Sequence, residues 1–200
     1  MLSSTFCRSV FLFLAIFALT APAQAGEPTE QMKLTIDKMI AILGDPALKN
    51  PAKTEERRKL LRDTASERFD WREMARRSLA RHWQKRTDAE KKEFVPLFAD
   101  LLEQTYMKRI ENYSGDKVMY DGEKVKGEYS LVKVRITTSK QVDIPVAYRL
   151  RKKGSQWLIY DVSIEGVSLV KNYRKQFDSV ILSSSYEGLV QKLREKVAKN

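Results

Sequence analysis

Hydrophobic residues recur every three to four positions in the first half of the chain, every second position in its middle, and every three to four positions again near its end. The first spacing is typical of amphipathic helices, and the second is typical of strands with one covered face. The pattern therefore predicts helices within residues 30–113, a sheet within residues 117–163 and closing helices within residues 167–198. Helices and strands segregated along a chain in this way indicate an α+β fold.

Four helices are expected before the sheet. The second begins after Asn50, which can cap it, with Pro51 at its first position, and it runs to about residue 69. Capping-box spacing opens the third helix at Asp70 and the fourth at Thr87, and the fourth continues to about residue 113. The first helix spans residues 30–43 and has one apolar face, made of Met32, Ile36, Met39, Ile40 and Leu43.

Four strands with short connections are expected next, and such strands form antiparallel hairpins. Their ranges are 117–125, 128–139, 141–152 and 155–163. The third strand alternates most clearly, so one side of the sheet is wet and the other is covered. The second strand shifts phase between Leu131 and Val132, which predicts a bulge and a sharply curved sheet. We therefore expect a curved four-stranded antiparallel sheet enclosed by N-terminal and C-terminal helices, a cone with an apolar interior.

Residues 1–25 have the three parts of a secretory signal. Arg8 supplies the basic region, residues 10–19 the apolar run, and Ala23-Gln24-Ala25 the cleavage site. A buried N-terminal helix is the alternative, but the run is too short for a membrane span and small residues follow it. We expect cleavage before Gly26, so that residues 26–200 form a single domain.

The only cysteine, Cys7, lies within this predicted signal, so the mature chain is expected to have neither a disulfide nor a lipid anchor. The whole chain has 37 Lys and Arg against 26 Asp and Glu, a net charge of +11. In a secreted protein, this charge favours lipid head groups, membrane surfaces or acidic proteins as partners over nucleic acid. The basic clusters are equally compatible with solvated helix faces.

The sequence contains little that indicates catalysis. His82 is the single histidine, no grouping of His, Cys and carboxylates has metal-ligand spacing, and no nucleophile elbow, phosphate-binding loop or dinucleotide glycine pattern occurs. One enzymatic hypothesis remains, with Asp161 as a general base beside Tyr160. Neighbours along a strand point to opposite faces, which argues against a shared pocket. We expect no enzyme activity, no metal and no cofactor.

Two stretches carry a family resemblance. The first runs from Phe69-Asp70 to Met74 and on through Leu79-Ala80-Arg81-His82-Trp83, and the second is Trp157–Phe177, which includes Glu165-Gly166-Val167-Ser168-Leu169. Together they resemble the MlaC family of periplasmic phospholipid carriers, also called toluene-tolerance or ABC-transporter auxiliary proteins. Ala80 departs from the family's pattern, which has glycine there, and this puts the local backbone geometry in question.

The resemblance implies a nuclear-transport-factor-like cone, a periplasmic location and no catalysis. It implies a phospholipid cargo carried between an inner-membrane ABC transporter complex with an MlaD-like subunit and an outer-membrane lipoprotein complex with an MlaA-like subunit, with transient membrane contact. A carrier is physically reasonable, because two acyl chains of roughly 28 methylenes represent on the order of 20 kcal/mol of exposure to water.

The expected cavity lining comes from the long helix, the sheet and the segment after it. These candidates are Phe98, Leu101, Leu102, Tyr106, Val134, Ile136, Ile144, Val146, Tyr148, Val167, Leu169, Tyr173 and Phe177. Each could equally pack in an ordinary core, since only unfilled volume separates the two cases. Two alternatives stay open: a carrier of another apolar lipid such as a hopanoid or isoprenoid, and a basic protein-interaction module with a solid core.

Overall fold

The computed structural model describes residues 26–113 and 115–198, so the predicted signal at residues 1–25 lies outside the described residues. The α-helices are α1 (Glu27–Gly44), α2 (Thr54–Ser66), α3 (Trp71–Leu79), α4 (Asp88–Glu111), α5 (Leu169–Ser183) and α6 (Tyr186–Ala198). Short 3₁₀ helices are η1 (Pro46–Leu48), η2 (Pro51–Lys53) and η3 (Ala80–Lys85). The strands are β1 (Lys117–Lys126), β2 (Tyr129–Thr137), β3 (Asp143–Lys153), β4 (Gln156–Ile164) and β5 (Val167–Ser168).

The expected α+β class is confirmed, but in the described part of the chain the curved antiparallel sheet has five strands rather than four, in the order β1-β2-β3-β4-β5. The fifth strand was missed because Glu165-Gly166 is a hairpin turn rather than a plain strand-to-helix turn. Glu165 has φ 50° and Gly166 has φ 82°, as a tight two-residue hairpin requires. Val167 and Ser168 then pair with Ile164 and Ser163 before α5 begins.

The bulges that distort the sheet lie in β1 and β4. The register shifts once beside Asp121 of β1 and once at Tyr160 of β4, whereas β2 pairs with β3 without interruption. The predicted bulge in the second strand is wrong, because Ser130 takes the inward position that the hydrophobic pattern gave to its neighbour Leu131. Because a small polar residue lies on the covered face, the alternation of apolar and polar residues in the sequence looks shifted by one position.

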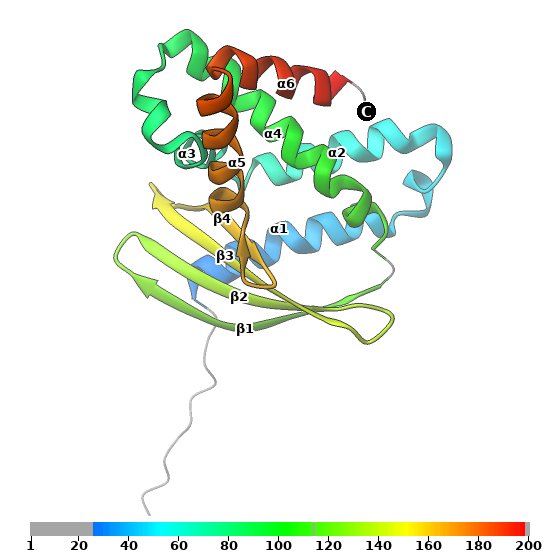
Figure 1. Ribbon diagram of the computed structural model, residues 1–200. Helices are drawn as coiled ribbons and strands as arrows, with labels where there is room; N and C mark the ends of the chain where they lie inside the picture. Colours follow the sequence, from blue (N-terminus) through cyan, green and yellow to red (C-terminus); the bar gives the residue numbers. More distant parts are fainter. Residues whose placement is uncertain (1–25, 114, 199–200) are drawn as a thin grey trace, which may run out of the picture.

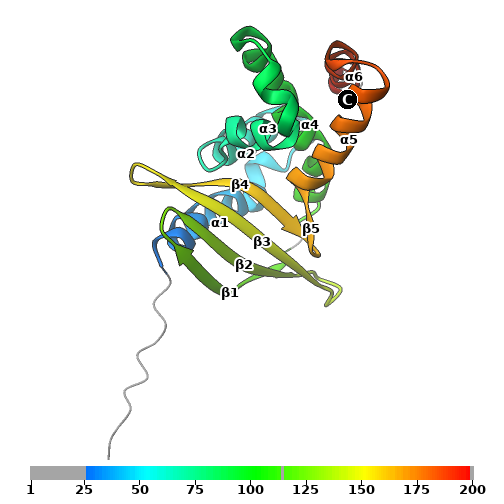
Figure 2. The ribbon, with the colours of Figure 1, turned by 60° about the vertical axis from the view of Figure 1, so that its left-hand side comes forward.

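The helices divide between one face of the sheet and the edge formed by β4 and the short β5 (Figures 1 and 2). Helix α1 lies along the sheet and contacts β1, β2 and β4, while α3 and α5 contact β4. The N-terminus of α4 has the predicted capping box, in which Thr87 and Glu90 bond each other's backbone N–H groups. At α3 only half of the box forms, because Asp70 accepts from the Glu73 N–H while the Glu73 carboxylate binds Arg76 and Arg77.

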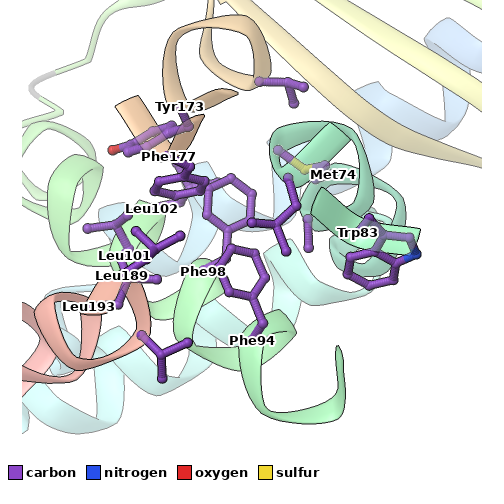
Figure 3. Packing of buried hydrophobic residues seen from close by; sticks show 14 of the residues in the cluster. Met74, Trp83, Phe94, Phe98, Leu101, Leu102, Tyr173, Phe177, Leu189 and Leu193 are labelled. Carbon is purple, nitrogen blue, oxygen red and sulfur yellow. The ribbon is translucent and has the colours of Figure 1, made fainter. Parts of the chain in front are cut away.

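A packed aromatic core joins α4, α5 and α6 (Figure 3). The Phe98 ring lies edge-on to Tyr173 and Phe177, with centroids 5.5 and 5.6 Å away, and Phe94 packs against Phe177 at 5.7 Å. A further group of buried residues, including Met32, Val132 and Leu150, lies between α1 and the covered face of the sheet. Phe69 and Tyr106 contact both groups.

Ala80 ends α3 in a conformation that suits glycine. Its φ is 47° and its ψ is −116°, a region in which a Cβ atom is strained by about 1–3 kcal/mol. We predict that Ala80→Gly raises the free energy of unfolding by about 1 kcal/mol, measured by urea denaturation. Ala99→Gly, within α4, is the matched control and should lower it by about 1 kcal/mol. A loss of stability in both variants would contradict this interpretation of Ala80.

Candidate functional site

A cavity of about 410 Å³ lies between the covered face of the sheet and helices α1, α2 and α4. Packed protein cores contain few voids larger than a water molecule, so a space of this size is not a packing defect. Its volume falls in the range of sites that bind small molecules and cofactors. The unfilled volume that separates a binding cavity from a solid core is therefore present here.

Most of the lining surface is apolar, and its charged residues are Arg62, Arg68, Glu103, Arg109 and Asp116. Helix α1 contributes Met32, Ile36, Met39, Ile40 and Leu43, and α4 contributes Leu102, Tyr106, Met107 and Ile110. The sheet contributes Val118, Val134, Ile136, Ile144, Val146, Tyr148, Ile159, Val162 and Ile164. Such a surface offers burial for hydrocarbon chains and few groups that could bind a polar molecule.

The structure places eight of the thirteen candidate residues in the cavity lining. These are Leu102, Tyr106, Val134, Ile136, Ile144, Val146, Tyr148 and Leu169. Phe98, Leu101, Tyr173 and Phe177 instead fill the aromatic core, and Val167 is 58 % exposed. The apolar stripe of α4 is broad enough to serve both sides: Phe98 and Leu101 face α5 and α6, while Leu102 and Tyr106 reach the cavity. Strand alternation in β5 buries Ser168 and turns Val167 outward.

Helix α1 supplies a large part of the helical lining that was not assigned from the sequence, and Val118, Ile159, Val162 and Ile164 of the sheet were not assigned either. The apolar face of α1 from Met32 to Leu43 was recognised, but nothing in a helical repeat tells whether the face packs against a neighbour or lines a cavity. Phe69, Trp71 and Ile110 were also not assigned to the lining. Hydrophobic spacing could have found all of these positions as covered residues, without showing that they line a cavity.

Polar contacts of the N-terminal half of α1 hold this helix against the rest of the protein. The Thr29 N–H and hydroxyl both donate to Glu123 Oε2 of β1, at 2.8 and 2.6 Å. The Arg68 guanidinium donates to Gln31 Oε1 at 2.8 Å, to Thr35 Oγ1 at 3.1 Å and to the Trp157 carbonyl at 3.1 Å. Burial lowers the pKa of Arg68, as expected for a guanidinium held by neutral acceptors.

Ion pairs connect α2 to α4 beside the cavity. Glu111, at the end of α4, accepts from Arg57 and Arg58, each at 3.0 Å, and Glu103 accepts from Arg62. Arg109 also lines the cavity and is exposed, with its guanidinium 5.8 Å from the Tyr106 ring centre. Among the residues that the structure describes, Arg109 forms no ion pair, so its charge is available to a ligand.

Two tyrosines of the lining, Tyr106 and Tyr148, stay neutral at physiological pH. Burial raises the pKa of Tyr148 to about 12, and burial also raises the pKa of Tyr106. Ionised groups are disfavoured in such surroundings. These hydroxyls can donate hydrogen bonds but cannot serve as bases near neutral pH.

Tyr160 and Asp161 do share a pocket, contrary to the expectation from strand alternation. The β4 bulge turns both side chains to the same face, where they line a smaller hollow outside the cavity. Asp161 accepts from the Ser168 hydroxyl at 2.7 Å and from the Val170 N–H at 3.1 Å, so it anchors the start of α5.

His82 Nε2 lies 2.7 Å from Asp178 Oδ1. Within residues 26–113 and 115–198, no cluster of His, Cys, Asp and Glu is suited to a metal ion.

The architecture and cavity define a class: α+β proteins that enclose an apolar space between a curved antiparallel sheet and helices. A sequence model of the family described as MlaC protein matches residues 33–195, and the chain belongs to that family. No helix in the described ranges has the length and apolar character needed to cross a membrane.

Two known proteins show what this chain is similar to. The intermembrane phospholipid transport system binding protein MlaC of Haemophilus influenzae is 27% identical over 120 residues, which cover 57% of this chain and 56% of that protein. The match thus spans about half the length of that relative. A phospholipid-binding protein from Ralstonia solanacearum, solved in complex with a phospholipid, superposes with a TM-score of 0.77 at 26% identity. That match covers 87% of this chain and 98% of the solved one.

The ion pairs of Glu111 with Arg57 and Arg58 make the free energy of unfolding depend on pH. Hydrogen bonds from Arg58 lower the pKa of Glu111 below its ordinary value of 4.5, although burial opposes the shift, and Arg57 contributes to it. A carboxyl with a lowered folded-state pKa stabilises the fold above its unfolded-state pKa, and this contribution is lost as pH falls through the folded-state value.

We therefore predict that Glu111→Gln lowers the free energy of unfolding at neutral pH by about 1–3 kcal/mol. The variant should also lose less stability than the wild type as pH falls below the ordinary value of 4.5 and through the lowered folded-state pKa of Glu111. Urea denaturation at a series of pH values measures both effects. Glu55→Gln is the control, since Glu55 pairs with Arg58 but is 85% exposed. If the free energy of unfolding fell equally with pH in the wild type and in Glu111→Gln, the ion pairs of Glu111 would not account for the pH dependence.

Proposed function

We propose that this protein is a phospholipid carrier that takes up the acyl chains of its cargo in the cavity between α1, α4 and the sheet. The observation that carries the proposal is the unfilled apolar volume of about 410 Å³, with a lining that offers hydrocarbon burial and little else. The phospholipid held by the Ralstonia solanacearum protein, which has a similar fold, supports it. A solid interaction module has no use for such a space.

The carrier is proposed to work between two membranes. The name of the Haemophilus influenzae relative, an intermembrane phospholipid transport system binding protein, supports this role. The signal-like pattern of residues 1–25 supports secretion to the periplasm. In this proposal, the protein exchanges lipid with an inner-membrane ABC transporter complex through an MlaD-like subunit and with an outer-membrane complex through an MlaA-like lipoprotein. A membrane hides acyl chains as well as the cavity does, so direction comes from affinity differences at the two ends.

The exposed position of Arg109 suggests where the head group lies. A guanidinium at the polar edge of an apolar cavity, without an ion-pair partner among the described residues, can bind a phosphate through two N–H donors. The acyl chains then extend inward, toward residues such as Val134 and Ile144. In this arrangement the glycerol esters lie near the Tyr106 ring, over which Arg109 is placed.

The first test is native mass spectrometry of the purified protein with identification of extracted lipid. We predict a stoichiometric phospholipid, and at least about tenfold lower occupancy in Ile144→Trp, because the indole occupies the space of an acyl chain. Val167→Trp is the matched control, since it adds the same ring at an exposed site and should load normally. A bound isoprenoid would show that the cargo is an isoprenoid rather than a phospholipid. A wild-type protein that takes up no lipid even from vesicles would refute the proposed carrier function.

The second test concerns the head group. We predict that Arg109→Glu binds phosphatidylglycerol about tenfold more weakly, while its loading with uncharged diacylglycerol is unchanged. Lys108→Glu makes the same charge change on the neighbouring exposed residue of α4, which does not line the cavity, and should behave as wild type. Vesicle-transfer assays with both lipids measure the difference. Equal losses for the two variants would show a general effect of charge rather than contact with the phosphate.

A further inference from the structure

A second hollow, of about 170 Å³, lies on the opposite face of β4 from the cavity. It is lined by Arg77, Arg149, Tyr160, Asp161, Val170, Lys171 and Arg174. The β4 bulge creates this arrangement, because Tyr160 and Asp161 turn outward together while Ile159 and Val162 line the cavity. The two hollows share no lining residue.

The arginines of this pocket are held in place before any ligand arrives. Arg77 bonds Glu73 at 2.7 Å, and its guanidinium lies 4.1 Å from the centre of the Tyr160 ring. Arg174 Nε donates to the Arg77 carbonyl at 2.9 Å, and Arg149 Nη1 donates to the Ser163 hydroxyl at 2.9 Å. Side chains fixed in this way lose little conformational entropy when they bind an anion.

Positive charge dominates the pocket. Asp161 is its one lining carboxylate, and both of its oxygens already accept hydrogen bonds from the start of α5. Arg149 Nη1 lies 3.6 Å from it. The described residues provide no ion-pair partner for Lys171 or Arg174, since Glu73 pairs with Arg77 and Asp178 with Arg81. An anionic group is therefore the ligand that this pocket suits.

We infer that the pocket receives an aspartate or glutamate side chain from an acidic segment of a partner protein. The hollow of about 170 Å³ is lined by residues of α3, α5, β3 and β4, and a space of this size suits one side chain, whereas a bilayer presents a broad plane of head groups. Planar guanidinium groups bind carboxylates through two parallel hydrogen bonds. Tyr129, which is 44% exposed and lies edge-on to Tyr160, adds an aromatic rim, and tyrosine with arginine is typical of the energetic centre of protein interfaces.

This inference rests on the proposed function in one respect, namely that a carrier has to dock on the proteins that load and unload it. Because the pocket and the cavity lie on opposite faces of β4, a docked carboxylate does not occupy space that the cargo needs. Docking and lipid binding can therefore be measured separately.

The test uses a short capped polyglutamate peptide, the purified protein and calorimetric titration at about 0.15 M salt, where diffuse attraction is screened. Arg174→Glu and Arg149→Glu should each weaken peptide binding by about tenfold or more. Lys175→Glu is the matched control, because it makes the same charge change on the next residue of α5, is exposed and does not line the pocket. It should bind the peptide nearly as well as the wild type.

Equal weakening by Lys175→Glu and Arg174→Glu would overturn the inference, since net charge alone would then explain binding. A different result would also overturn it: binding of phosphatidylglycerol vesicles or inorganic phosphate weakens in Arg174→Glu, while binding of the peptide does not. The ligand would then be a membrane or a free anion. Lipid occupancy of each variant, measured in parallel, should equal that of the wild type. Absence of lipid from the wild type would refute the proposed function without affecting the peptide result.

Discussion

The cavity depends on the way α1 is held over the sheet. Apolar surfaces in water tend to close on each other, so a helix with an apolar face needs contacts outside that face if a space is to remain beneath it. Glu123 supplies one such contact by accepting both donors of Thr29, and Arg68 supplies another by joining Gln31, Thr35 and the Trp157 carbonyl. These contacts involve the N-terminal half of α1. Met32 and the apolar face from Ile36 to Leu43 line the cavity.

The aromatic core stabilises a fold that leaves apolar surface unpacked around the cavity. The rings of Phe94, Phe98 and Phe177 are packed closely between α4, α5 and α6, and closely packed aromatic residues contribute strongly to the stability of a fold. The same helix α4 presents Leu102 and Tyr106 to the cavity. One helix thus belongs to a solid core and to the wall of the open space, and the ion pairs to α2 at Glu103 and Glu111 fix its position between them.

The sequence was informative about the elements and less so about the cavity. Period and capping residues predicted the helices and four of the strands, because alternation and hydrogen-bonding side chains are local properties. The predicted bulge in β2 was wrong because a polar residue, Ser130, occupies a buried position on the covered face. Strand β5 was missed because two residues are too few to show alternation. Phe98, Tyr173 and Leu102 could not be divided between core and cavity, since all three are covered apolar residues. Volume depends on how far α1 stands from the sheet, which polar contacts distant in sequence decide.

The β4 bulge links the open interior to the outer face. Without the extra residue at Tyr160, strict alternation would send Tyr160 and Asp161 to opposite faces, and a polar side chain would enter the apolar cavity. With it, Ile159 and Val162 both face inward, and Asp161 faces outward, where it binds the Ser168 hydroxyl and the Val170 N–H. That contact fixes the start of α5, whose first residue, Leu169, lines the cavity. A single irregularity in one strand therefore keeps Asp161 out of the cavity, anchors the start of α5, and turns the Tyr160 ring outward, where Arg77 packs over it.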